Sequence, residues 1–187
     1  PLSYIRYVDS YDGEVYVGLQ ESVQTLAGDT GEAIETHDWY AGTYRLESLA
    51  QIHGNTLFTA WIDTLDAHPV GDNGVSWSNA DLGRVYTTPV IDNSLVVVGT
   101  GEGNVYAFER QSGEIRWEAS ITNAVAAMET TGSHVWVGDT DIGLTAYDRE
   151  TGSLVHRSTK PVNGDDIAVA DGRLLLGGDT ATAYTID

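Results

Sequence analysis

The chain has 187 residues, of which 28 are acidic and 9 are basic, so its formal net charge at pH 7 is −19. Such a surface repels nucleic acids and anionic membranes, because proteins bind both through Lys and Arg. The absence of cysteine excludes disulfides, thiolate metal sites and a cysteine nucleophile. We expect no nucleic-acid partner, and no membrane insertion either, because no apolar run approaches the about 18 residues of a membrane helix.

The kind of charge is also informative, since Lys160 is the only lysine among the basic residues. An acidic excess that keeps arginine and almost lacks lysine resembles the proteins of salt-loving archaea. In molar salt the Debye length falls to about 3 Å, which screens the repulsion between carboxylates. We therefore expect a halophilic protein, placed outside the cell or on its surface. A cytoplasmic location and an ordinary acidic protein are the alternatives.

Taken in chain order, the predicted elements are short strands that each end in a small residue. The five clearest are VYVG (15–18), LFTA (57–60), VVVG (96–99), VWVG (135–138) and LLLG (174–177). Their last positions are separated by 42, 39, 39 and 39 residues. This spacing predicts an internal repeat of about 40 residues.

Two series of turn residues keep the same register. The first stands before these strands, at Asp12-Gly13, Gly54-Asn55, Asn93-Ser94, Gly132-Ser133 and Asp171-Gly172. The second follows the next strand, at Thr30-Gly31, Asn73-Gly74, Ser112-Gly113 and Thr151-Gly152. Gly, Asn and Asp favour tight turns because they tolerate positive φ, so each unit has at least two turns and three strands.

A fourth strand precedes the first turn, as at residues 4–10, 85–91 and 167–170. Four short strands in about 40 residues are typical of one propeller blade. The helical alternative rests on a weak 3.6-residue pattern over 45–52, and the repeat register makes that segment the innermost strand of the second unit. We predict an all-β propeller of four-stranded antiparallel blades.

Two units carry a shared sequence phrase. In the third it is Ala107-Phe108-Glu109, then Ser112-Gly113 and Trp117; in the fourth it is Ala146-Tyr147-Asp148 and Thr151-Gly152, with His156 in place of the tryptophan. The first unit keeps Thr30-Gly31 without the tryptophan, and the divergent second has Trp77 after Gly74. The phrase resembles the repeat of the PQQ-like β-propellers. That superfamily includes quinoprotein alcohol dehydrogenases and non-enzymatic relatives such as an outer-membrane assembly lipoprotein.

The blade count follows from the spacing, which aligns Asp187 with Glu109 and leaves the last unit without its outermost strand. We predict one domain, 1–187, with blades at about 4–40, 41–80, 81–120, 121–160 and 161–187. It comprises four complete blades and a three-stranded fifth. Since the resembled family has seven or eight blades, the chain is either a five-bladed ring or a fragment of a larger one.

The resemblance implies a non-catalytic binding scaffold with a protein partner or a surface ligand, and the acidic composition adds the expectation of a high-salt environment. The alternative is a PQQ- and calcium-dependent quinoprotein oxidoreductase domain. Enzymes of that kind are several times longer and often have adjacent cysteines beside the cofactor, whereas this chain has neither feature. We therefore expect no enzymatic activity and no cofactor, with PQQ and Ca²⁺ belonging to the alternative.

Few residues suggest a site. GTGEG at 99–103 looks like a phosphate-binding glycine loop, but an alternating strand pattern follows it instead of a helix, so a hairpin loop is expected. Asp139 and Asp141 stand two apart in a predicted turn and are the candidate calcium ligands, as is the pair Asp165-Asp166. The five histidines have no metal-binding spacing, which favours packed or exposed side chains.

Five tryptophans are candidates either for packing or for a surface site. Trp117 matches the tryptophan that packs between blades in the resembled family, and Trp136 lies in a predicted core strand. Trp39 and Trp61 are less constrained by the repeat. They are therefore the candidates for a ligand or partner surface.

Overall fold

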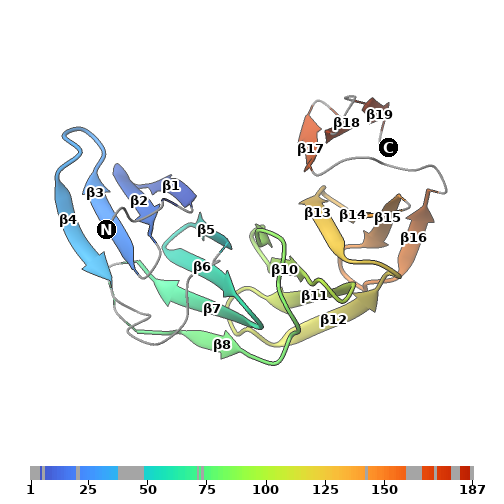
Figure 1. Ribbon diagram of the computed structural model, residues 1–187, viewed down its shortest axis with the longest axis horizontal. Coiled ribbons are helices and arrows are strands. Elements are labelled where there is room, and N and C mark those ends of the chain that lie inside the picture. Colours follow the sequence, from blue (N-terminus) through green and yellow to red (C-terminus); the bar gives the residue numbers. More distant parts are fainter. Residues whose placement is uncertain are drawn as a thin grey trace. The chain divides into compact units, whose positions relative to one another are not determined.

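The computed structural model describes residues 5, 7–19, 22–37, 49–70, 72, 74–141, 143–158, 166–170, 172–177 and 182–185. The chain divides into two compact units, residues 1–81 and 82–187. Over the described residues every regular element is a β-strand, and the strands form five antiparallel sheets (Figure 1).

The first unit contains two four-stranded sheets. The first sheet has the order β1 (Tyr7–Tyr11), β2 (Glu14–Gly18), β3 (Val23–Ala27) and β4 (Ala33–His37). The second has the order β5 (Leu49–His53), β6 (Thr56–Trp61), β7 (Thr64–Pro69) and β8 (Trp77–Asn79). Residues 49–52, where a helix was the alternative, therefore lie in a strand.

The second unit contains three sheets. The third sheet comprises β9 (Val90–Ile91), β10 (Leu95–Gly99), β11 (Asn104–Glu109) and β12 (Ile115–Ser120). The fourth comprises β13 (Val125–Thr130), β14 (His134–Asp139), β15 (Leu144–Asp148) and β16 (Leu154–Arg157). The fifth has three strands, β17 (Asp166–Ala170), β18 (Arg173–Gly177) and β19 (Thr182–Thr185). The prediction of four complete blades and a three-stranded fifth is confirmed.

We predicted positive φ in the turn before the second strand of each sheet. The prediction is correct for some of these turns and wrong for others. Asp12 and Gly13 have φ of 49° and 81°, and Gly54 and Gly172 are also positive. Asn93-Ser94 and Gly132-Ser133 do not have positive φ. At the former turn the Asp92 carboxylate accepts hydrogen bonds from the N–H groups of Ser94 and Leu95, at 2.7 and 2.9 Å, and shapes the turn instead.

The turn before the fourth strand is uniform in the first, third and fourth sheets, whereas Gly74 in the second sheet does not have positive φ. Gly31, Gly113 and Gly152 have φ of 70°, 73° and 68°. Each donates its N–H to the carbonyl of the residue four positions earlier, at 2.7 to 2.8 Å. The glycine is required because a side chain is strained in this left-handed conformation.

The first strand of the third sheet is shorter than predicted. Residues 85–91 were expected to be continuous, whereas only Val90–Ile91 pairs as β9 and Val85 forms an isolated bridge to Thr100. The physical reason is Thr87. Its buried hydroxyl accepts a hydrogen bond from Gly99 N–H at 3.0 Å and thus replaces a backbone partner of β10.

The register of the fifth sheet also differs from the prediction. Leu95 pairs with Glu109 and His134 with Asp148, but the equivalent Arg173 pairs with Thr185. Thr185, and not Asp187, therefore occupies the position of Glu109. The pairing of β18 with β19 is therefore shifted by two residues relative to the constant spacing. The GTGEG segment is a hairpin loop between β10 and β11, as predicted.

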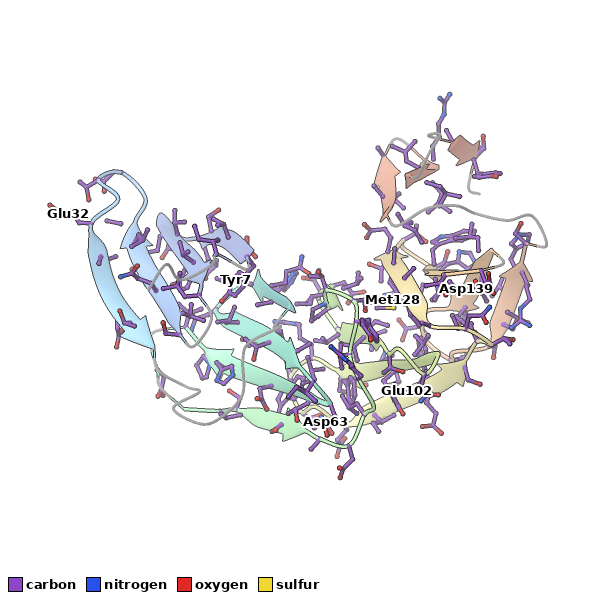
Figure 2. All side chains as sticks on the ribbon, in the orientation of Figure 1. Tyr7, Glu32, Asp63, Glu102, Met128 and Asp139 are labelled. Carbon is purple, nitrogen blue, oxygen red and sulfur yellow. The ribbon has the colours of Figure 1, made fainter. Side chains whose placement is uncertain are left out.

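Within each unit, neighbouring sheets bury apolar faces against each other. In the second unit, the cluster between the third and fourth sheets contains Leu95, Val97, Ala107 and Trp117 from one side. The other side contributes Val125, Met128, Val135, Val137 and Tyr147. Figure 2 labels Met128 on β13. Burial of apolar area at about 25 cal/mol per Å² makes this packing the main stabilising term.

Trp117 joins the third sheet to the β15–β16 turn of the fourth. Its Nε1 donates to the carbonyl of Arg149 at 2.8 Å, and its ring centroid lies 6.2 Å from that of Tyr147. A Cβ on Gly152 would lie 2.7 Å from the indole Cδ2. Glycine is thus needed at this turn both for its φ and for the approach of the tryptophan, so the predicted packing role of Trp117 agrees with its contacts.

An ion pair reinforces the same junction. Arg149, in the β15–β16 turn, contacts the Asp92 carboxylate through Nε and Ser94 Oγ through its terminal nitrogen, both at 2.5 Å. Burial acts to raise the pKa of Asp92. The hydrogen bonds from Arg149 and from the N–H groups of Ser94 and Leu95 outweigh it and hold the pKa well below its ordinary value.

Replacing Gly152 with alanine will test the tryptophan contact, and Gly31→Ala is the matched control. The φ angles of the two glycines differ by only 2°, but a Cβ on Gly31 meets no atom within 4 Å. We expect Gly31→Ala to cost about 1–2 kcal/mol from backbone strain. Gly152→Ala will cost about 1–3 kcal/mol more from the collision with Trp117. Urea unfolding measures both values, and equal costs would contradict the contact.

Stability will depend on the Asp92 carboxylate at low pH. Because the folded-state pKa is depressed, its contribution is fully present above the ordinary carboxyl pKa of about 3.9 and is lost as pH falls through the lower folded value. Urea unfolding in this acid range will show a shallower loss of stability for Asp92→Asn than for the wild-type chain. Identical pH slopes would refute the assignment.

Candidate functional site

The predicted metal pair lies at the end of β14 and in the loop that follows it. Asp139 ends this strand and is only 6% exposed, whereas Asp141 is exposed. The Asp139 Oδ1 accepts the N–H of Asp141 at 2.8 Å, which is a local turn of the kind that aspartate commonly forms. Figure 2 labels Asp139 in the fourth sheet.

Among the described residues, the fold brings no third His, Asp or Glu ligand to the predicted calcium pair of Asp139 and Asp141. Over the described residues, no group of three or more His, Asp or Glu side chains is arranged to hold a metal ion. Asp165 lies outside the described residues, as does the side chain of Asp166. Calcium at Asp139 and Asp141 therefore stays a prediction, and so do PQQ and the absence of any cofactor.

The predicted surface tryptophans are not tested by the fold. Trp39 lies outside the described residues. Trp61 ends β6, but the placement of its side chain is not described. Their proposed role as a ligand or partner surface stays a prediction.

One histidine is deeply buried. His68 on β7 is 1% exposed, with Nε2 at 3.3 Å from Thr59 Oγ1 and Nδ1 at 3.3 Å from the carbonyl of Gly74. One neutral tautomer satisfies both contacts, with Nδ1–H donating to Gly74 and Nε2 accepting from Thr59. These contacts favour a packed histidine, in agreement with the sequence-based interpretation.

A cavity of about 440 Å³ lies between the fourth and fifth sheets, lined in part by Trp136, Leu144, His156 and Leu174. His156 pairs with Ala146 as Trp117 pairs with Ala107, so it occupies the position of the packing tryptophan. Its smaller ring contacts Trp136 at a centroid distance of 6.4 Å. The substitution of histidine for tryptophan accounts for part of the space.

The outermost strands carry apolar side chains that face solvent. Ile34 on β4, Ile115 on β12, and Leu154 and Val155 on β16 are each 51–54% exposed. All of them follow the glycine turn by two or three residues. Sequence reasoning missed this feature, although an apolar residue two or three positions after Gly31, Gly113 and Gly152 was a usable signal.

These outermost strands are also sheet edges in the order of the described strands. In the first, third and fourth sheets a β-bulge interrupts the pairing of the third strand with the fourth. Bulges at edges increase the local twist and limit uncontrolled strand pairing. Because the bulges lie on the side that faces the third strand, the outer side of each edge strand still offers backbone donors and acceptors next to exposed apolar side chains.

Two further observations concern membrane-spanning helices and the contacts of arginine side chains. Within the described part of the chain there is no helix long and apolar enough to cross a membrane. Among the described residues, Arg116 on β12 pairs with Glu109 of its own sheet and with Glu150 in the β15–β16 turn. This arginine thus links the third sheet to the fourth.

Comparison with solved structures identifies the fold. BamB from Moraxella catarrhalis is 17% identical with a TM-score of 0.74, over 96% of this chain and 58% of that chain. The computationally designed Ika8 protein is 16% identical with a TM-score of 0.82, over 98% of this chain and 59% of that one. The designed Ika4 protein is 14% identical with a TM-score of 0.68, over 78% and 94%.

The chain therefore spans less than three fifths of the length of the first two structures. At these identities the likeness shows the fold alone, which is that of BamB-like propellers. Among curated proteins, no sequence matches this chain.

The family itself is shown by sequence. The model of the family described as "Outer membrane protein assembly factor BamB" matches residues 19–187, which is most of the chain. The matched residues include both copies of the Ala-aromatic-acid phrase and Gly152, which packs against Trp117. The chain belongs to this BamB family of PQQ-like repeat β-propellers.

Proposed function

We propose that this chain is a non-catalytic scaffold that holds a protein partner through the outermost strands of its sheets, in a high-salt environment at the cell surface or outside the cell. Family membership supports this proposal, because the family is described by an assembly factor and not by a reaction. Fold alone does not decide function, so the argument rests on the surface.

The observation that carries the proposal is the exposed apolar residue on the outermost strands. In a chain with 28 acidic residues, solvent-facing strand positions are expected to be polar. Ile115 and Leu154 instead expose more than half of their surface. Because they lie on edge strands, an extended segment of a partner can pair with the backbone while its side chains contact these residues.

The charge of the chain favours one kind of partner segment. A net charge of −19 attracts basic segments and repels acidic ones, which includes nucleic acids. In molar salt this attraction is screened, so the apolar contact and the backbone hydrogen bonds supply the affinity. The expected partner segment is therefore extended, basic and apolar at alternate positions.

The high-salt part of the proposal rests on self-repulsion. Without salt the carboxylates repel one another over roughly 30 Å or more, whereas in molar salt the range is about 3 Å. Thermal unfolding will therefore have a clearly higher midpoint in molar KCl than in dilute buffer. An unchanged midpoint would contradict a halophilic origin.

Selection from a library of displayed short peptides, carried out in KCl, tests the partner proposal. We expect basic peptides with alternating apolar residues to be enriched. Their binding will fall when Ile115 is replaced with lysine, because the charge disrupts the apolar contact. Gln111→Lys is the matched control, since it adds the same charge at an exposed residue of the preceding turn. Failure to enrich any peptide, or equal losses in both variants, would overturn the proposal.

A further inference from the structure

The third sheet has a hollow on its surface beside its outermost strand, β12. The hollow has a volume of about 310 Å³, and its lining comes from the neighbouring strands β11 and β12 (Figure 1): Asn104, Tyr106, Glu118, Ala119 and Ser120. Asn104 pairs with Ser120 across the two strands, and the next such pair along is Tyr106 with Glu118. Paired side chains share one face of a sheet, and alternate positions share it too. The opposite face carries Trp117, which packs against the fourth sheet.

The carboxylate of Glu118 is the charged group of this hollow. Glu118 is exposed, and within the described part of the chain no cationic side chain pairs with it. The arginine of the same strand, Arg116, is instead bound by Glu109 and Glu150. The hollow therefore presents a negative charge that the contacts between the sheets do not use.

The ring of Tyr106 lines the hollow on β11 and is partly exposed. Its centroid lies 6.1 Å from that of Phe108, with 29° between the ring planes, and Phe108 is fully buried. A core residue thus holds the tyrosine ring in place. An aromatic ring attracts a cation that lies within about 6 Å of its centroid. The side chains of Asn104 and Ser120 add oxygen acceptors for N–H groups, so the hollow has the chemistry that binds a guanidinium or ammonium group.

The backbone beside the hollow points outward. In the order of the described strands, β12 is the edge of its sheet. The N–H of Ile121 donates to the carbonyl of Gly103 at 2.8 Å, which makes these two residues a hydrogen-bonded pair. Because hydrogen-bonded and non-hydrogen-bonded pairs alternate along an antiparallel ladder, Glu118 and Tyr106 form a non-hydrogen-bonded pair. The N–H and C=O of Glu118 therefore point away from β11, where an extended segment can pair with them.

We propose that the hollow binds a lysine or arginine side chain of a partner segment that pairs with β12 as an added strand. The segment is that of the proposed function, on which this site therefore rests, and the hollow is the place of its basic residue. Ile115 pairs with Phe108 and so lies on the same face as the hollow. The basic side chain and the apolar side chain that contacts Ile115 consequently project from one face of the added strand, at alternate positions. Molar salt weakens this contact less than it weakens the attraction between distant charges, because a partly buried pair is screened less.

Binding of N-acetyl-arginine amide to the purified chain in molar KCl tests the hollow by itself, with N-acetyl-glutamine amide as the uncharged control. Molar salt screens the general attraction of a cation to a chain of net charge −19. We expect the arginine compound to shift the NMR signals of residues 104–106 and 118–120, and the glutamine compound to leave them unchanged. Glu118→Gln will weaken binding about tenfold, because it removes the ion pair. Glu114→Gln is the matched control, since it removes the same charge from an exposed residue of the preceding turn.

A second variant tests the ring. Tyr106→Leu keeps an apolar side chain against Phe108 but removes the aromatic ring, and we expect binding to weaken about threefold. Signals that shift across the acidic surface instead of on β11 and β12, or equal losses in Glu118→Gln and Glu114→Gln, overturn the site.

The peptide selection in KCl separates the failure of this site from that of the proposed function. Enriched peptides should lose affinity for Glu118→Gln but not for Glu114→Gln. Enriched peptides that bind Glu118→Gln as tightly as the wild-type chain overturn the site and leave the proposed function standing. If the arginine compound binds at the hollow but no peptide is enriched, the proposed function is the part that fails.

Discussion

The constraint on which the structure depends is that a four-stranded sheet of this repeat is apolar on both faces. Every residue of β10, from Leu95 to Gly99, is buried, although successive side chains point to opposite sides. A single sheet of this composition exposes too much apolar surface to be stable, so each one needs a neighbour in register. The cluster that joins Val97 and Trp117 to Val135 and Val137 is such an interface, and it explains why the chain repeats.

This constraint determines where specificity and function can lie. The packed faces leave little room for polar chemistry, so charged groups gather in the turns, where Arg149 joins Asp92 and Ser94 across the junction of two sheets. The Gly152 turn packs against Trp117 at the same junction. The glycine turn and the ion pair thus stabilise the same arrangement of the third and fourth sheets. The outermost strands contribute least to the core and retain exposed apolar residues such as Ile115 and Leu154. They are therefore the part of the repeat most available to a partner.

The strands and most of the turns were predictable because their signals are local. Alternation with period two identifies a strand, and a left-handed turn such as Gly152 requires glycine wherever it occurs. The predictions failed where a side chain accepts a hydrogen bond that the pattern assigned to the backbone. Thr87 accepts the N–H of Gly99, and Asp92 accepts an N–H at the Asn93-Ser94 turn. The two-residue register shift between β18 and β19 was also missed, because the repeat spacing was assumed to be constant. Burial of His68 and exposure of Ile115 depend on tertiary neighbours, which no local pattern reports. The candidate site was less predictable than the fold for the same reason, since a pair such as Asp139 and Asp141 also suits an ordinary turn.

Hydrogen exchange measured strand by strand in a Val97→Ala variant tests the central claim most directly. Val97 lies on β10, but its side chain belongs to the cluster that also buries Val135 and Val137 on β14. If adjacent sheets stabilise each other through these faces, the amides of β14 will lose protection together with those of β10. Loss of protection confined to β9–β12, with β14 unchanged, would contradict the account, because it would mean that each sheet is stable without its neighbour.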